Sequence, residues 1–149
     1  MREPVVVDST CLIGLDQIGR LDLLPKLFEP VLAPPEVGRE FGSTPDWLRI
    51  EPPSSDALVA ALKATVDDGE AEAIALATEK GLQIVLDDRR ARDLAKRMGL
   101  KILGTVAVLI RAKRAGLIPW INPVLTELSE KGFHLSEELK REALRIAGE

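Results

Sequence analysis

The chain has little of what several common kinds of site require. It has a single cysteine, Cys11, so it cannot form an internal disulfide, and its single histidine leaves a zinc site without suitably spaced ligands. We expect Cys11 in the core, because no base lies near it in the sequence. Aromatic residues make up only 3% of the chain, which favours packing roles for Trp47 and Trp120 over base stacking.

Long apolar runs are also missing. The longest stretch without a charged residue, 115–126, contains two prolines and falls well short of the roughly 20 apolar residues that span a bilayer. Only a few apolar residues precede Asp8, too few for the apolar region of a signal peptide. We therefore expect no membrane segment and a cytoplasmic location, with which a lone cysteine agrees.

The charge is distributed unevenly along the chain. The whole sequence of 149 residues carries −4, but residues 89–114 hold nine basic residues against Asp93 alone, a net +8 that leaves −12 for the remainder. The overall charge argues against binding nucleic acid by bulk attraction. The basic segment is typical of a solvated pair of helices, or of a surface that contacts phosphates beside an acidic site.

Short apolar strands alternate with helices, which predicts a three-layer α/β/α fold with a central, mainly parallel sheet. With 46% hydrophobic residues the chain can form one core, so we expect a single domain over 1–149, with C-terminal helices at about 120–149 appended to it. In such folds ligands bind at the carboxyl ends of the strands, near a switch in strand order. The expected strands are 5–7, 30–33, 48–51, 82–86 and 101–103.

Acidic residues follow two of these strands directly: Asp8 after 5–7, and Asp87 and Asp88 after 82–86. A carboxylate in that place is partly desolvated and needs a cation, a hydrogen-bond donor or a proton. Each acid also has a structural interpretation, as a helix N-cap or as a partner of the arginines in 89–92. Together, at the ends of parallel strands, they favour a site for a hard cation.

Further acids lie on the predicted helices. Glu70 opens a helix, where an acid is stabilising in any case, and Glu72 points to another face. Glu40 lies near the end of a helix, where the dipole disfavours negative charge, so it indicates another use; Glu36, earlier in that helix, is compatible with the dipole.

Five segments in this order resemble the PIN-domain family: VVVDSTCLI (5–13), PPEVGREF (34–41), GEAEAIALA (69–77), IVLDDRRAR (84–92) and GTVAVL (104–109). The resemblance covers nearly the whole chain and is closest to a prokaryotic PIN-like branch related to VapC-type toxin ribonucleases. It implies a metal-dependent endoribonuclease that uses Mg²⁺ or Mn²⁺ and cuts RNA.

Carried over by position, the resemblance implies four catalytic acids, Asp8, Glu40, Glu70 and Asp88. Asp8, Glu70 and Asp88 would bind the metal ion, with the hydroxyl of Ser9 or Thr10 beside the first acid. Two departures from the family leave alternatives open. In the family the third acid is usually an aspartate that lies closer to the apolar residues of its helix than Glu70 lies to Ile74. Either Glu70 or Glu72 can therefore be the third acid. The family commonly has a threonine just before its last aspartate, where this chain has Leu86-Asp87. Asp87 therefore shares the metal-binding role of Asp88 or takes its place.

The partners expected on this interpretation are RNA, an antitoxin protein and a second copy of the chain. Two other functions stay open: a catalytically weak PIN-like module that binds nucleic acid or protein, and a receiver-like phospho-acceptor domain. The receiver interpretation ranks low. Receiver domains have their acid pair early in the chain, whereas the pair in this chain, Asp87 and Asp88, comes late. The residues expected to hold the RNA backbone are Arg89, Arg92, Arg111, Lys113 and Arg114.

Overall fold

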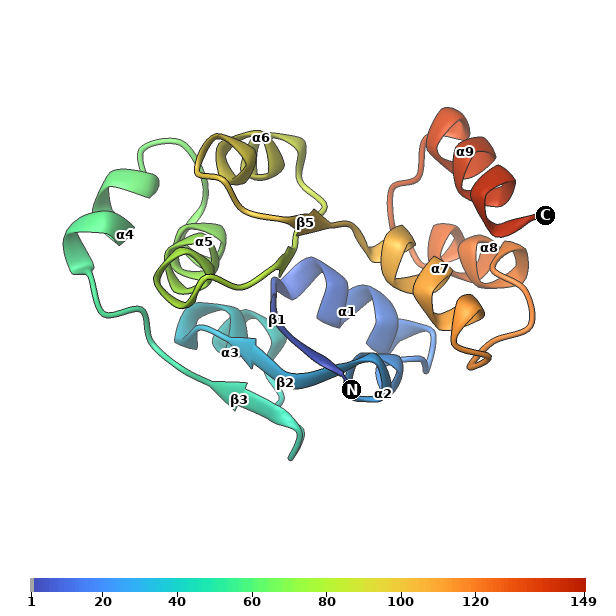
Figure 1. Ribbon diagram of the computed structural model, residues 1–149, viewed down its shortest axis with the longest axis horizontal. Coiled ribbons are helices and arrows are strands. Elements are labelled where there is room, and N and C mark those ends of the chain that lie inside the picture. Colours follow the sequence, from blue (N-terminus) through green and yellow to red (C-terminus); the bar gives the residue numbers. More distant parts are fainter. Residues whose placement is uncertain (1) are drawn as a thin grey trace.

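The computed structural model describes residues 2–149 and contains the predicted alternation of strands and helices (Figure 1). Each strand that the sequence predicts is present, within a few residues of its expected bounds. In chain order the elements are β1 (Glu3–Val7), α1 (Ser9–Gln17), α2 (Leu23–Leu27), β2 (Phe28–Ala33), α3 (Pro35–Phe41), β3 (Leu48–Ile50), α4 (Asp56–Leu62), α5 (Asp68–Lys80), β4 (Ile84–Val85), α6 (Arg89–Arg97), β5 (Ile102–Leu103), α7 (Thr105–Arg114), α8 (Asn122–Glu130) and α9 (Glu137–Ala147).

The five strands form one parallel sheet in the order β3-β2-β1-β4-β5. The chain leaves β1 toward β2 on one side and later returns to add β4 on the other, so strand order switches between β1 and β4. Because parallel crossovers are right-handed, connections that run in opposite directions lie on opposite faces of the sheet. The predicted three-layer α/β/α class is therefore confirmed.

Burial explains why the central elements form. Val5, Val6 and Val7 of β1 are fully buried, as a strand covered on both faces should be. The helix α5 is buried almost all round, since it packs on β1 and β4 and is covered by α3 and α4. The small alanine side chains of α5 allow its backbone to lie close to the sheet and to both helices. This packing holds the first turn of α5 next to the ends of β1 and β4.

The last three helices gather on one side of the molecule, away from α4 (Figure 1). The helix α7 packs on β5 and α9, while α8 contacts α1. The segment 131–136 between α8 and α9 lines one hollow together with Asp87 and Asp88, which follow β4. None of the helices in residues 2–149 is long and apolar enough to cross a bilayer.

Candidate active site

Asp8 lies at the carboxyl end of the central strand, where strand order switches. Val7 pairs with Val85 of β4, and the Asp8 amide donates to the Val85 carbonyl (3.3 Å). The carboxylate is only 4% exposed, and its Oδ1 is buried without a hydrogen-bond partner in the structure. Asp8 occupies the N-cap position of α1, yet its side chain makes no capping hydrogen bond. The structural interpretation of Asp8 as a cap therefore does not account for its burial.

Asp87 and Asp88 follow β4 and differ in how they are engaged. Asp87 accepts from the Thr105 amide (2.8 Å) through Oδ1 and from the Thr105 hydroxyl (2.6 Å) through Oδ2, which joins the end of β4 to the start of α7. Asp88 is exposed and caps α6 by accepting from the Ala91 amide through Oδ2 (3.0 Å). Asp87 thus has both oxygens occupied, whereas Asp88 uses one for the cap.

Glu70 belongs to a capping box at the start of α5. Its amide donates to Asp67 Oδ1 (2.8 Å), and its Oε1 accepts from the Asp67 amide (3.2 Å). This box explains the helix start and holds the carboxylate, which is only 7% exposed, beside Asp8 and Asp88. Glu72 instead accepts from the Glu36 amide (3.1 Å) and so joins α5 to α3. Of these two glutamates, the structure brings Glu70 to the site.

Glu40 reaches the cluster from α3 across a glycine. A Cβ on Gly69 would collide with the Glu40 carboxylate, so only glycine at this position leaves room for it. Desolvation raises the pKa of Glu40, and the charge of Asp67 raises it further, against a lowering effect of the Ser9 side chain. The helix dipole disfavours a negative charge near the end of α3, where Glu40 lies. Its contact with Gly69 of α5 accounts for an acid at this position.

The acids influence one another's ionisation. Burial raises the pKa of Asp8 to about 7, against a lowering effect of the Ser9 backbone amide, and the charges of Asp67, Glu40 and Asp87 raise it further. Burial likewise raises the pKa of Glu70 to about 7, with smaller contributions from Asp67, Asp8 and Asp88. Carboxylates from β1, α3, α5 and β4 therefore repel one another at one edge of the sheet.

Asp67 is the member of this cluster that sequence reasoning missed. It raises the pKa of Asp8, Glu40 and Glu70 by its charge. In the sequence, Asp67-Asp68-Gly69 indicates only a break between two helical stretches. The signal that could have found it is the spacing Asp67-x-x-Glu70, which is typical of a capping box.

The cluster suits a hard divalent cation in its donor chemistry. Within residues 2–149 no three His, Cys, Asp or Glu side chains already converge in the geometry of a metal centre. Mg²⁺, however, keeps several waters and needs only one or two direct carboxylates. The buried, unpartnered Oδ1 of Asp8, surrounded by acids, is a donor that a cation would satisfy. Asp8, Glu70 and Asp88 remain the candidate ligands, whereas both oxygens of Asp87 already accept hydrogen bonds from Thr105.

Two hollows are lined by Asp88, one on each flank of α6. The α5–α6 hollow, about 780 Å³, lies between Thr65–Asp67 and α6 and is open to Glu70 and Asp88. The α6–α9 hollow, about 940 Å³, lies between α6 and the segment Gly132–Ser136 and is open to Thr10, Asp87 and Asp88. Both are lined by Asp88, Arg89 and Asp93, so Asp88 lies where the two hollows meet.

The basic residues predicted to hold RNA divide into two groups. Arg89 and Arg92 lie on α6 beside the hollows, and Arg92 Nη1 donates to the Leu86 carbonyl (2.8 Å). Arg111, Lys113 and Arg114 lie in the last turn of α7, whose first residue contacts Asp87. Arg114 is thus roughly 13 Å along the helix from that contact, and the structure does not bring these three residues to the acids.

Lys113 is also engaged by other groups. Its ammonium donates to the Ala147 carbonyl (2.6 Å) and to Glu149 (3.0 Å), and it lies 5.0 Å from the centre of the Trp120 ring. Arg111 lies over the Phe28 ring at 5.7 Å. These contacts hold α9 and β2 to α7, which is a packing role.

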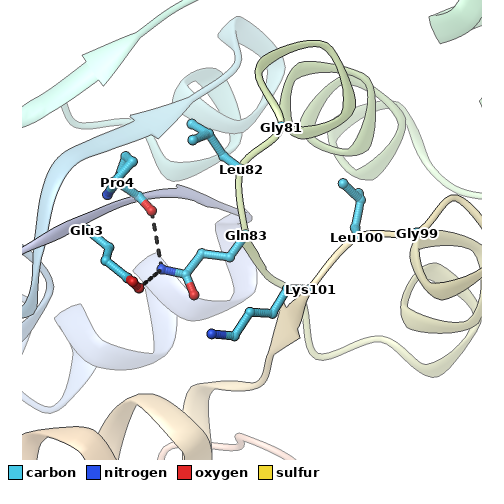
Figure 2. Close-up of a pocket in the computed structure, with 8 residues that line it drawn as sticks. All are labelled: Glu3, Pro4, Gly81, Leu82, Gln83, Gly99, Leu100 and Lys101. Atoms are coloured by element: carbon cyan, nitrogen blue, oxygen red, sulfur yellow. Dashed lines mark hydrogen bonds between the residues drawn. The ribbon is translucent and has the colours of Figure 1, made fainter.

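A third hollow, about 400 Å³, lies at the opposite, amino end of the strands and is shown in Figure 2. The Gln83 side chain lines this hollow and is held by two hydrogen bonds: Nε2 donates to Glu3 and to the Pro4 carbonyl (3.2 Å each). Lys101 lines the same hollow. Glu3 is the one carboxylate in its lining, so this hollow lacks the acidic chemistry of the other end.

Comparison with known proteins agrees with this arrangement. A family model described as a PIN domain matches residues 4–149, nearly the whole chain. A comparison with curated proteins found no match.

The first prediction concerns the pH dependence of the metal-free protein. The folded-state pKa values of Asp8 and Glu70 lie near 7, above their ordinary values of 3.8 and 4.5. Between those limits the folded chain binds more protons than the unfolded chain, so the free energy of unfolding should rise as pH falls from about 7.5 to 5. Urea unfolding in the presence of a chelator measures it.

Two variants make this measurement specific. Asp8→Asn should raise stability at pH 7.5 and weaken the pH dependence, whereas Asp16→Asn, at an exposed position on the same helix, should change neither. If the free energy of unfolding depends on pH equally in wild type and Asp8→Asn, the surroundings of Asp8 do not raise its pKa.

The second prediction concerns Gly69. Gly69→Ala should leave the fold intact and stability unchanged or up to about 1 kcal/mol higher, because alanine favours a helix and the Glu40 side chain can move aside. Any activity that depends on Glu40 should fall at least about tenfold.

The control is a double-mutant cycle. In a Glu40→Ala background, Gly69→Ala should cause no further loss of activity. A full additional loss there would mean that Gly69 acts through something other than Glu40.

Proposed function

Because the chain belongs to the PIN-domain family, a family of nuclease-type fold, we propose that it is a metal-dependent endoribonuclease. The observation that carries the proposal is the Asp8 carboxylate, which is buried at the switch in strand order with one oxygen unpartnered. Acids from three other elements face it. A nuclease needs such a cluster, whereas a binding surface for RNA alone would avoid negative charge next to phosphates.

The proposed division of labour follows from the contacts. When bound, Mg²⁺ or Mn²⁺ would supply Lewis acidity and make water nucleophilic near neutral pH. Asp8 would be the most buried of the residues that hold the ion, because its Oδ1 has no hydrogen-bond partner in the protein. Asp88 and Glu70 each have one oxygen fixed by a helix cap, which holds the second oxygen in a defined direction.

Glu40 and Asp87 have supporting parts in this proposal. Glu40 is exposed and lies beside Ser9 and Gly69, so it can accept a proton from water at the open side of the cluster. Asp87 is held by Thr105 and keeps the end of β4 in register with α7. Arg89 and Arg92 provide positive charge for the RNA backbone next to the acids.

The alternative is a PIN-like module that binds nucleic acid or protein with little or no catalysis. One observation favours it: within residues 2–149 the acids do not already form a three-ligand centre. An antitoxin partner and a homodimer remain proposals of the same kind. Co-purification with the product of a neighbouring reading frame tests the first, and light scattering tests the second.

The third prediction is that Asp8→Asn and Asp88→Asn each lower Mn²⁺-dependent cleavage of RNA at least about a hundredfold, the cost of losing one essential electrostatic group. In Asp88→Asn the new side chain would still cap α6, because asparagine is an effective N-cap, so the fold should persist. Cleavage of a labelled single-stranded RNA measures the loss, and circular dichroism checks the fold.

Asp16→Asn serves as the matched control and should cut at the wild-type rate. Parental activity in Asp8→Asn would remove Asp8 from the mechanism. Absence of cleavage by wild type on every RNA offered, with Mn²⁺ present, would favour the binding module.

A further inference from the structure

One wall of the α6–α9 hollow is a single face of α6. Arg89, Arg92, Asp93 and Lys96 line it, at the spacing of three and four residues that places side chains on one side of a helix. Arg89 and Lys96 are exposed, and none of the ion pairs within residues 2–149 involves either of them. This wall therefore offers positive charge to a ligand.

The opposite wall is a short segment anchored at both ends. The Phe133 amide donates to the Leu128 carbonyl (3.0 Å), and its ring packs against Gly14 of α1, where a Cβ would lie 3.0 Å from Phe133 Cδ2. Ser136 accepts from the Leu139 amide (3.0 Å) and so caps α9. Between these anchors His134 is exposed and lines the hollow across from α6.

The size and position of the hollow fit one unit of a nucleic-acid strand. Its volume of about 940 Å³ is within the range that holds ligands as large as a nucleotide. It shares Asp88, Arg89 and Asp93 with the α5–α6 hollow, so a strand that follows both hollows passes directly over Asp88.

We propose that the α6–α9 hollow is a subsite for one nucleotide of single-stranded RNA, next to the phosphodiester that is cut, with Lys96 binding a phosphate and the His134 ring stacking on the base. The subsite rests on the proposed nuclease function of the adjoining acids. Lysine contacts phosphate without regard to sequence, and histidine is one of the side chains on which unpaired bases stack. A duplex keeps its bases inside and cannot offer one to His134, so single strands are the preferred substrate.

The fourth prediction tests Lys96 by binding rather than by cleavage. In the 149-residue Asp8→Asn protein, Lys96→Gln should weaken binding of a fluorescent single-stranded oligoribonucleotide about five- to tenfold, measured by anisotropy with a chelator present. The slope of log affinity against log salt should become shallower by about 0.7, the value for one phosphate contact on a single strand.

Lys101→Gln is the matched control. Lys101 is an exposed lysine that lines the hollow at the amino end of the strands (Figure 2), whereas Asp8, Asp87 and Asp88 follow the carboxyl ends of their strands. Its neutralisation changes the net charge by the same amount and should leave affinity and salt slope unchanged. Equal effects of the two lysine variants would overturn the subsite.

Three substitutions at His134 test the stacking contact. At pH 8, His134→Ala should weaken binding about fivefold or more, as loss of one base stack does, without changing the salt slope. His134→Phe and His134→Trp should restore most of the affinity, because the ring and not its charge is needed. If they bind as weakly as His134→Ala, the stacking role is wrong.

These outcomes separate the subsite from the nuclease proposal. If wild type cuts no RNA but Lys96 and His134 behave as stated, the nuclease proposal fails and the hollow stands as a nucleotide-binding subsite without an adjoining cut. If wild type cuts RNA while the Lys96 and Lys101 variants bind alike, the subsite fails and the nuclease proposal stands. If Asp8→Asn does not bind single-stranded RNA, or binds a duplex more tightly, the subsite is wrong.

Discussion

The burial of a carboxylate at the end of the central strand is the constraint on which the rest of the site depends. Strand β1 is covered on both faces, so the residue that follows it begins in an apolar environment, and that residue is Asp8. Its Oδ1 has no protein donor, and burial together with the charges of neighbouring acids raises its pKa to about 7. An isolated buried charge is costly, so the folded chain favours either a proton or a cation there.

The other acids of the cluster are held by interactions that also define the fold. Asp67 and Glu70 begin α5 through a capping box, and Asp88 caps α6. The same hydrogen bonds that start these helices each fix one carboxylate oxygen and leave the other outside the cap. The site therefore needs few residues dedicated to it alone. Glu40 is the exception, because it comes from α3 and the place its carboxylate occupies depends on the absence of a side chain at Gly69.

What the sequence predicts well is what local patterns determine. Asp8 and Asp88 follow apolar runs, and a parallel sheet brings such positions to one edge, so their proximity could be predicted. The approach of Glu40 to Gly69 could not, because it depends on how α3 packs on α5. His134 looks isolated in the sequence, and only the return of 131–136 across α1 places it near Asp88. Conversely, Arg111 and Arg114 share the basic segment with Arg89, but the length of α7 carries them away from the acids.

The central claim is that the acids form one cation site whose innermost ligand is Asp8, and calorimetric titration with Mn²⁺ at pH 7.5 tests it most directly. The account predicts saturable binding to wild type that is lost in Asp8→Asn and retained in Asp16→Asn. Saturating Mn²⁺ at about 100 times its dissociation constant should also stabilise wild type by roughly 2.7 kcal/mol, a rise in Tm of about 5–10 °C. Undiminished Mn²⁺ binding by Asp8→Asn, or no binding by wild type, would contradict the account.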